Sequence, residues 1–312
     1  MTLSQLRYAI TVADSRSMNQ AAQKLFISQP SLSAAIRELE DEVGIEIFRR
    51  TNRGIQVTPD GEEFVGYARQ VVEQYALIEA RYVDKEKVKK KFGVSMQHYS
   101  FAVQAFVEMV RRFGMERYEF SIYETQTYDL IENVKNFRSE LGILYLNDFN
   151  RKVLGKIFEE NNLEFHELFD CQEYVYLWSG HPLAKKKEIT LEDLEDYPFL
   201  SFDQGSNNSF YFAEEVFSTY EYKQSIKAND RATMLNLMKG LNGYTLCSGI
   251  ICENLNGSEY CAVKLSTEET MTIGYLKRKG IPLSSIGKEY LKEISKYNVT
   301  IQHTIIPRGV LA

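Results

Sequence analysis

The sequence predicts an α/β protein in three parts: a helical head with a small β wing, one long helix, and a larger α/β domain. Residues 17–40 have the periodicity of two short helices joined by a tight turn, and residues 59–85 have a heptad pattern. From residue 91 onwards, short apolar runs typical of strands alternate with amphipathic helices. The chain has 312 residues, 44% of them hydrophobic, which is enough for two or three domain cores.

The formal net charge of −6 gives no general attraction to nucleic acid, so the distribution of charge matters more than its sum. Residues 1–58 hold seven lysines and arginines against six acidic residues, a net charge of +1. Residues 91–312 hold 24 against 30, a net charge of −6. Any contact with nucleic acid must therefore use cations that gather locally in the head.

Two absences in the sequence predict a cytoplasmic protein with no membrane partner. No window approaches the roughly 20 apolar residues that span a bilayer. The first five residues lack the basic and apolar regions of a signal peptide. The four cysteines are then expected to be reduced thiols, because the cytoplasm is a reducing compartment.

The head begins with an amphipathic helix, predicted from apolar residues at three- and four-residue steps between residues 3 and 13. A second helix follows Ser17, whose hydroxyl can accept a hydrogen bond from a free amide of the first turn. Small alanines on this helix allow a third helix to approach closely. That third helix starts at Ser28, and Pro30 falls in its first turn, where a missing amide N–H is tolerated.

The outward face of the third helix is small and hydrogen-bonding, with one long cation. It carries Gln29, Ser31, Ser33, Ala34 and Arg37. Such a face suits insertion into a major groove, where glutamine, serine and arginine can meet base edges and phosphates. A helical hairpin with a solvated polar face fits this stretch equally well, because helix-turn-helix patterns have many false positives.

A short hairpin, or wing, is predicted between residues 45 and 58, with turn chemistry at Asn52-Arg53-Gly54. Arg49, Arg50 and Arg53 cluster on it. Three arginines beside a groove-binding helix suit phosphate contact or insertion into a minor groove. The alternative is a solvated basic turn.

Thr58-Pro59 then starts a long helix, about 40 Å from Thr58 to about Lys85, because threonine can cap it and proline is accepted at the first helical position. Its heptad seam consists of Phe64, Ala68, Val71, Tyr75, Ile78 and Tyr82. This seam packs either against its own domain or against the same helix of a second copy, and we expect the second copy. A charged run at residues 84–91 is typical of a linker.

The α/β domain is predicted to hold a parallel sheet, because strands alternate with helices. Expected strands are 92–96, 119–123, 141–146, 163–169, 173–178, 199–202, 224–228, 260–265 and 271–277, and expected helices are 100–113, 129–137, 210–217, 231–239 and 285–297. Ligands of open α/β sheets lie beyond the carboxyl ends of strands, which indicates residues 95–100, 124–127 and 145–147. The helix from Ser100 would turn its first amides towards a bound carboxylate.

About sixty consecutive residues of the head resemble the LysR-type transcriptional regulators. The resemblance rests on Leu3-Ser4-Gln5-Leu6-Arg7-Tyr8, Ser17, Ala21-Ala22, Ser28-Gln29-Pro30-Ser31-Leu32-Ser33, Ile36, Leu39-Glu40, Gly44, Phe48-Arg49-Arg50 and Val57-Thr58-Pro59-Asp60-Gly61. It implies a winged helix-turn-helix that binds double-stranded DNA, a two-lobed effector domain similar to periplasmic binding proteins (type 2), a homodimer that forms a tetramer, and RNA polymerase as a further partner.

This resemblance divides the chain into a DNA-binding domain (1–58), a dimerisation helix (59–90), an effector domain (91–302) and a tail (303–312). Lobe one is expected at about 92–163 plus 268–302, with lobe two between them. The predicted DNA contacts are Ser17, Asn19, Gln29, Pro30, Ser31, Ser33, Arg37, Arg49, Arg50 and Arg53.

A narrower likeness, to regulators of cysteine and methionine uptake in Gram-positive bacteria, rests on short runs in the effector domain. They are Gln97-His98-Tyr99, Glu124-x-x-Thr127, Gly142-Ile143-x-Tyr145-Leu146-Asn147, Gly180-His181-Pro182-Leu183-Ala184, Asp230-Arg231-Ala232-Thr233 and Ser248-Gly249. The likeness implies an amino-acid-like ligand such as O-acetylserine.

Strand-end positions and this likeness together predict a ligand site at Ser95, Gln97, His98, Tyr99, Glu124, Thr125, Thr127 and Ser201. In this set Glu124 would receive the ammonium group of the ligand. His98 could equally be a loop histidine hydrogen-bonded to backbone.

Enzyme chemistry finds no support in the motifs, since there is no P-loop, no Gly-x-Ser-x-Gly and no HExxH spacing. No cofactor or metal is expected. Two other interpretations stay open: a thiol-based redox sensor using Cys247 and Cys252, and a binding module or enzyme that carries a helical head. Both thiols lack basic neighbours in the sequence that would favour the thiolate.

Overall fold

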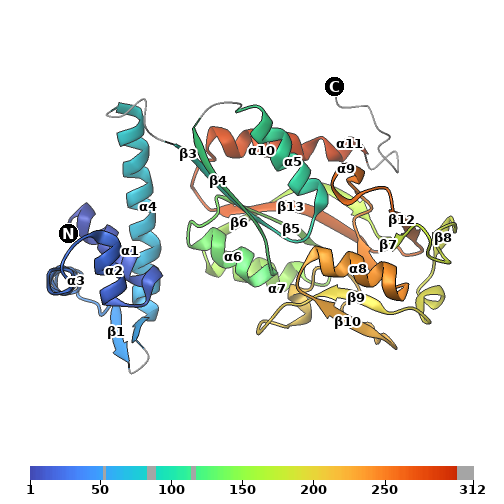
Figure 1. Cartoon of the computed structure of the whole chain (residues 1–312), viewed down its shortest axis with the longest axis horizontal. Helices are drawn as coiled ribbons and strands as arrows, with labels where there is room; N and C mark the ends of the chain where they lie inside the picture. Colours follow the sequence, from blue (N-terminus) through green and yellow to red (C-terminus); the bar gives the residue numbers. More distant parts are fainter. Residues whose placement is uncertain (52–53, 83–88, 114–116, 301–312) are drawn as a thin grey trace. The chain divides into compact units, whose positions relative to one another are not determined.

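The computed structural model describes residues 1–51, 54–82, 89–113 and 117–300 (Figure 1). Contacts between residues divide the chain into two compact units, Met1–Lys89 and Lys90–Ala312. In the part of the chain that the structure describes, no helix is long and apolar enough to cross a bilayer. The predicted tail at residues 303–312 lies outside the described residues.

The first unit contains three short helices, a two-stranded hairpin and one long helix. The elements are α1 (Leu3–Ser15), α2 (Met18–Leu25), α3 (Gln29–Val43), β1 (Phe48–Thr51), β2 (Gly54–Val57) and α4 (Pro59–Tyr82). The predicted caps are confirmed: the Ser17 hydroxyl accepts from Gln20 N at 3.4 Å, and the Ser28 hydroxyl accepts from Ser31 N at 3.2 Å.

The core of this unit lies where α1, α2 and α3 meet. Ala9 and Ala21 are fully buried there, and Leu32 and Leu39 of α3 fill the space between the helices. The structure confirms the expected close approach, because alanine side chains leave room for a neighbouring helix. The polar positions of α3 therefore lie on its opposite side.

The wing is the antiparallel pair β1–β2, with Phe48 opposite Val57 and Thr51 opposite Gly54. The Glu40 carboxylate, in the last turn of α3, accepts hydrogen bonds from Ile47 N at 2.8 Å and Phe48 N at 2.9 Å. This carboxylate ties the end of α3 to the first strand of the wing.

The heptad seam of α4 is divided between two environments. Phe64 packs against the core of its own unit, and Ala68 is only 2% exposed. Val71, Tyr75 and Ile78 are 49%, 39% and 56% exposed. The predicted cover by a partner helix thus cannot apply to the first two positions, which α4 buries within its own unit. The side chain of Tyr82 lies outside the described part.

The second unit is built around a five-stranded sheet with the order β4-β3-β5-β13-β6. Its strands are β3 (Lys90–Met96), β4 (Tyr118–Glu124), β5 (Leu141–Leu146), β6 (Leu163–Gln172) and β13 (Thr270–Arg278). Strand β3 is parallel to β4 and β5, whereas β13 is antiparallel to β5 and β6. The expected parallel sheet is therefore mixed, because β13 runs opposite to its neighbours.

Helices cover both faces of this sheet (Figure 1). They are α5 (Ser100–Arg111) and α10 (Ser285–Ser295) on one face, α6 (Thr127–Lys135) and α7 (Arg151–Glu160) on the other, with α11 (Tyr297–Thr300) following α10. Strand β5 is buried throughout and serves both layers: Ile143 packs with α5 and α10, whereas Leu144 packs with α6 and α7. We call this sheet and its helices lobe one.

Lobe two contains a four-stranded sheet of order β11-β7-β12-β8 and a parallel pair β9–β10. Its elements are β7 (Tyr174–Trp178), β8 (Glu188–Ile189), η1 (Glu192–Leu194), β9 (Phe199–Phe202), η2 (Phe210–Phe212), β10 (Ser225–Ala228), α8 (Arg231–Leu241), β11 (Thr245–Cys247), α9 (Glu253–Asn256) and β12 (Tyr260–Leu265). The chain passes between the lobes from β6 to β7 and from β12 to β13.

Two further sequence predictions need correction. Lobe one does not end at residue 163, because β6 continues its sheet to Gln172. The helix expected at 210–217 is only the short 3-10 turn η2. Helix α7 was not predicted at all. In this segment Tyr211 stacks on Phe149 and Phe212 packs edge-on against Tyr128, while Phe210 is exposed, so no continuous buried helical face forms.

Candidate nucleic-acid interface and ligand cavity

The outward face of α3 is largely open to solvent. Pro30, Ser31, Ala34 and Arg37 are exposed, and within the described residues Arg37 makes no ion pair. Gln29 and Ser33 are half-buried and bonded to each other, Nε2 to Oγ at 2.7 Å. These side chains are therefore available, directly or after exchange of one hydrogen bond, to a large partner in front of the helix.

Two further predicted contacts lie on α2 and at its cap: Asn19 is exposed, and Ser17 is half-buried by its capping role. On the wing, Arg49 forms an ion pair with Glu46 at 2.8 Å. The side chain of Arg50 and the whole of Arg53 lie outside the described residues. The predicted arginine cluster is thus described only at Arg49, which carries its own counter-charge.

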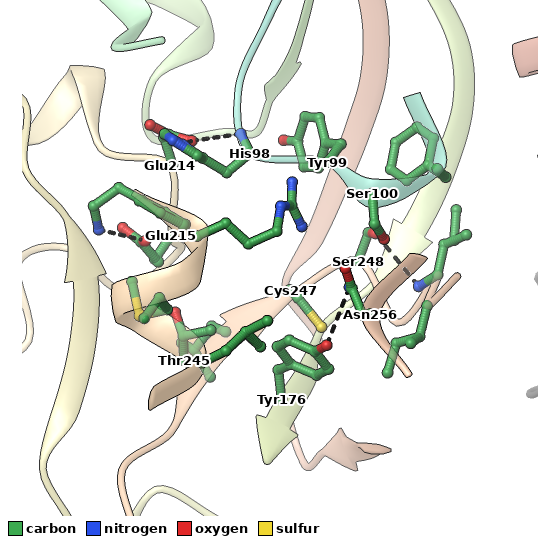
Figure 2. Close-up of a pocket in the computed structure, with 18 of the residues that line it drawn as sticks. His98, Tyr99, Ser100, Tyr176, Glu214, Glu215, Thr245, Cys247, Ser248 and Asn256 are labelled. Carbon is green, nitrogen blue, oxygen red and sulfur yellow. Dashed lines mark hydrogen bonds and ion pairs between the residues drawn. The ribbon is translucent and has the colours of Figure 1, made fainter. Parts of the chain in front are cut away.

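A cavity lies between the two lobes of the second unit (Figure 2). Lobe one contributes the segment from His98 to Phe101, where β3 leads into α5, together with Met271. Lobe two contributes apolar side chains of α8 and β11 and the polar groups Glu215, Arg231, Thr245 and Ser248. The space open to the centres of water-sized molecules is about 70 Å³, which suits a small ligand.

A chain of buried hydrogen bonds from His98 through Glu214 and Gln204 to Thr127, which we call the relay, joins the lobes beside this cavity. One Glu214 oxygen lies 2.8 Å from both the backbone N and Nδ1 of His98 (Figure 2). The other accepts from Gln204 Nε2 at 3.0 Å, and Gln204 Oε1 accepts from Thr127 N at 3.0 Å. Phe202 stacks on the His98 ring with centroids 3.6 Å apart. His98 therefore anchors lobe two to lobe one.

A second polar contact between the lobes is the ion pair of Glu124 and Arg231. Glu124 ends β4, and Arg231 begins α8 directly after its cap Asp230, whose carboxylate accepts from Thr233 N at 2.8 Å. Unlike the relay, this pair is partly solvated, with side chains 28% and 22% exposed.

Of the eight predicted ligand residues, only His98 and Tyr99 line the cavity. Ser95 is fully buried against Ser139 and Asn133, and Gln97 donates to the Thr127 hydroxyl at 2.7 Å. Glu124 is engaged by Arg231, Thr125 donates its N–H to Met96 O, and Ser201 lies within the β9–β10 pair. The structure brings Gln97 and Thr127 together, but as partners of each other.

Sequence reasoning left several polar cavity groups out of the predicted ligand residues: Arg231, Thr245, Ser248, Glu214, Glu215 and Asn256. A signal for the first was present: the pattern Asp-x-x-Thr at residues 230–233 caps a helix and fixes the arginine in its first turn. Thr245 is 5% exposed, and its hydroxyl has no hydrogen-bond partner in the described structure. A buried hydroxyl without a partner is unfavourable, so it marks a place for a ligand atom.

Burial also sets the protonation of groups around the cavity. It raises the pKa of Glu215 well above its ordinary value, and the charge of Glu214 adds to the effect. Burial raises the pKa of Cys247 to about 12, and that of Cys252 upwards as well. Both thiols therefore hold little thiolate at neutral pH.

No group of histidine, cysteine and acidic side chains in the described part of the chain could hold a metal ion.

Two segments of the chain match described families. Residues 3–62 match the bacterial regulatory helix-turn-helix proteins of the lysR family, and residues 98–291 match the LysR substrate binding domain. The chain belongs to the LysR family. It is thus a DNA-binding transcriptional regulator with an effector-binding domain, in a family without enzymatic activity.

Relatives of this regulator have diverged in sequence. It is 29% identical over 255 residues to the Hca operon transcriptional activator HcaR of Escherichia coli (strain K12), covering 80% of this chain and 82% of that protein. It is 23% identical to the hydrogen peroxide-inducible genes activator of Escherichia coli O157:H7, covering 91% and 92%. The structure of a full-length OxyR variant from Pseudomonas aeruginosa superposes with a TM-score of 0.66 at 22% identity over 94% of each chain, which supports the fold.

Proposed function

We propose that this regulator is controlled by a small carboxylate-bearing molecule bound between its lobes. The observation that carries the proposal is a cavity between the lobes that is lined by both Arg231 and Thr245, whose hydroxyl has no partner in the described structure. A guanidinium binds a carboxylate through two parallel N–H···O bonds. The hydroxyl supplies a further hydrogen bond that no protein group in the described structure takes up.

The rest of the cavity narrows the ligand class. The start of α5 at Ser100 favours an anion, because first-turn amides and the helix dipole point towards it. The Glu214 side chain, on the other side of the cavity from Ser100, favours an ammonium group. An amino acid or its acyl derivative satisfies both ends. The likeness to cysteine and methionine uptake regulators supports O-acetylserine as the first candidate.

Calorimetric titration of the full chain with O-acetylserine, cysteine, methionine and homoserine tests this class. Arg231→Gln should weaken binding roughly tenfold or more, because a hydrogen bond between charged groups contributes about 1.5–3 kcal/mol. Arg151→Gln is the matched control, since Arg151 pairs with Glu167 on the outer surface of lobe one. Full affinity in Arg231→Gln would place the site elsewhere, and tight binding of an uncharged sugar would overturn the ligand class.

DNA binding by this regulator is assigned to α3 and the wing. The open face of α3, with exposed Ser31 and Arg37, is supported by the family match over residues 3–62. A gel shift on DNA upstream of its own gene, with and without O-acetylserine, tests the assignment. Retention should fall steeply with salt, because phosphate contacts release counterions.

We infer that the exposed half of the α4 seam pairs two copies of the chain. Val71, Tyr75 and Ile78 form an apolar strip at helical spacing, which is unfavourable in water. Ile78→Asp should shift sedimentation towards monomer, whereas Gln74→Asp, on an already polar exposed position, should not. Dimers that persist unchanged in Ile78→Asp would exclude this strip. A tetramer and contact with RNA polymerase remain implications of the family.

A thiol-based peroxide response is the alternative suggested by the hydrogen peroxide-inducible relatives. The chemistry of Cys247 and Cys252 argues against it, because burial raises the pKa of both thiols and leaves little thiolate to react. Peroxide should therefore leave DNA binding unchanged, and a loss of binding that Cys247→Ser prevents would revive the alternative.

A further inference from the structure

The cation of the cavity is already held by a carboxylate of the chain itself. Arg231 lines the cavity from lobe two and at the same time forms an ion pair with Glu124 of lobe one. A ligand carboxylate that binds this guanidinium must therefore share it with Glu124 or displace it.

We propose that Glu124 is an internal competitor of the ligand, so that ligand binding to Arg231 releases Glu124 and breaks this ion pair between the lobes. This inference rests on the proposed function, because it assumes that the ligand carboxylate binds Arg231. It also replaces the expectation that Glu124 receives an ammonium group: its carboxylate already accepts from the guanidinium.

Charge around the guanidinium favours displacement over sharing. Arg231 is permanently charged, and in the described structure its guanidinium is paired with the Glu124 carboxylate of β4. A ligand carboxylate would add like charge beside Glu124. Because the Glu124 side chain is already 28% exposed, its release into water changes its solvation free energy only a little.

The contact that Glu214 makes between the lobes is expected to persist. The Glu214 side chain is only 4% exposed and accepts from the His98 and Gln204 donors. Removing it would leave buried donors without partners, which is unfavourable. Loss of the Glu124 contact alone therefore leaves the lobes joined at His98 and Thr127, and also at Tyr145, whose hydroxyl donates to Ala213 O at 3.2 Å.

Glu124→Gln tests the competition, with O-acetylserine and cysteine as probes on the full chain. Removing the internal carboxylate should lower the Kd of the probe that binds by roughly two- to fivefold, the effect of losing a partly exposed ion pair. Glu167→Gln is the matched control, because it removes a carboxylate paired to an arginine outside the cavity, and it should leave the Kd unchanged.

Hydrogen exchange of the segment 124–127 gives a second measurement. In the wild type, the probe should accelerate exchange there, because Glu124 is released. In Glu124→Gln, exchange should already be fast without the probe and should not rise further. Glu124→Asp, which shortens the side chain but keeps its charge, should fall between the two and serves if the glutamine variant does not fold.

The outcomes separate this inference from the proposed function. If no probe binds either the wild type or Glu124→Gln, both the proposed function and the competition by Glu124 are overturned. If the wild type binds through Arg231 but Glu124→Gln binds equally well, only the competition is overturned. Weaker binding by Glu124→Gln would show that Glu124 contacts the ligand and would also overturn it. Binding by Glu124→Gln alone would support the competition strongly.

Discussion

The outer face of α3 and the contact between the lobes are both polar, but they differ in how far their groups are satisfied. Arg37 and Ser31 are exposed on α3, whereas Gln204 and Glu214 are buried between the lobes and bonded to lobe one. A face that awaits a large partner leaves its side chains open. The contact between the lobes has its groups bonded to each other, so a ligand that binds Arg231 must do so by exchange of partners, as proposed for Glu124.

The largest expected effect comes from removing a hydrogen-bond acceptor between the lobes, where the polar groups are bonded to each other. Glu214→Ala leaves the His98 N–H and the Gln204 amide without a buried acceptor, which should reduce the free energy of unfolding by about 3 kcal/mol. Urea unfolding followed by the fluorescence of Trp178, the single tryptophan, reports lobe two directly. A loss below about 1 kcal/mol would mean that water replaces the carboxylate and that the relay is no anchor.

The next effect concerns the exposed outer face of α3. Arg37→Ala should weaken binding to a specific operator by about 1–3 kcal/mol, the value of a good base contact, and leave the urea midpoint unchanged, because Arg37 is exposed and makes no ion pair in the described residues. Gel shifts at fixed salt measure the affinity. Lys24→Ala, an exposed cation on α2, is the control. Wild-type affinity in Arg37→Ala would remove α3 as the reading helix.

A smaller effect concerns Glu173, a buried acidic residue that belongs to neither of these two regions. Glu173 lies between β6 and β7, is fully buried, and both its carboxyl oxygens have no partner in the described structure. Burial raises its pKa well above the ordinary value of 4.5, and the charge of Glu269 adds to this. The folded state therefore holds a proton that the unfolded state releases, so stability falls as the pH rises above about 4.5.

Glu173→Gln removes that proton equilibrium. Its stability advantage over the wild type should widen by about 1 kcal/mol between pH 5 and pH 6, as measured by urea unfolding at each pH. Glu167→Gln, which replaces an exposed carboxylate of the same lobe, should show no such widening. An advantage that is constant with pH would mean that Glu173 is charged in the folded protein.

The same contrast explains what the sequence could reveal. The head was predictable because its signals are local: caps at Ser17 and Ser28, and a glycine in the turn of the wing at Gly54, where φ is 117° and a Cβ would lie 3.0 Å from the Arg16 carbonyl oxygen. The alternation of strands and helices likewise indicated the α/β domain.

The ligand cavity was only partly predictable because its lining comes from segments far apart in the chain. Strand ends indicated His98 and Tyr99, which line the cavity, but the same rule selected Gln97 and Thr127, which are bonded to each other inside lobe one. No periodicity in the sequence shows that Thr245 would face the segment after β3. Such pairings depend on how the lobes pack, which is a property of the folded unit.

The hydrogen bonds of Glu40 have a consequence for how the head meets a double helix. Because its carboxylate fixes Ile47 and Phe48 to the last turn of α3, the helix and the wing form one rigid unit with a fixed spacing between them. A rigid unit cannot adapt to the spacing of neighbouring grooves, so we expect the duplex to bend or twist to fit it. Base pairs that no side chain touches would then influence affinity through their stiffness, with flexible pyrimidine–purine steps preferred there.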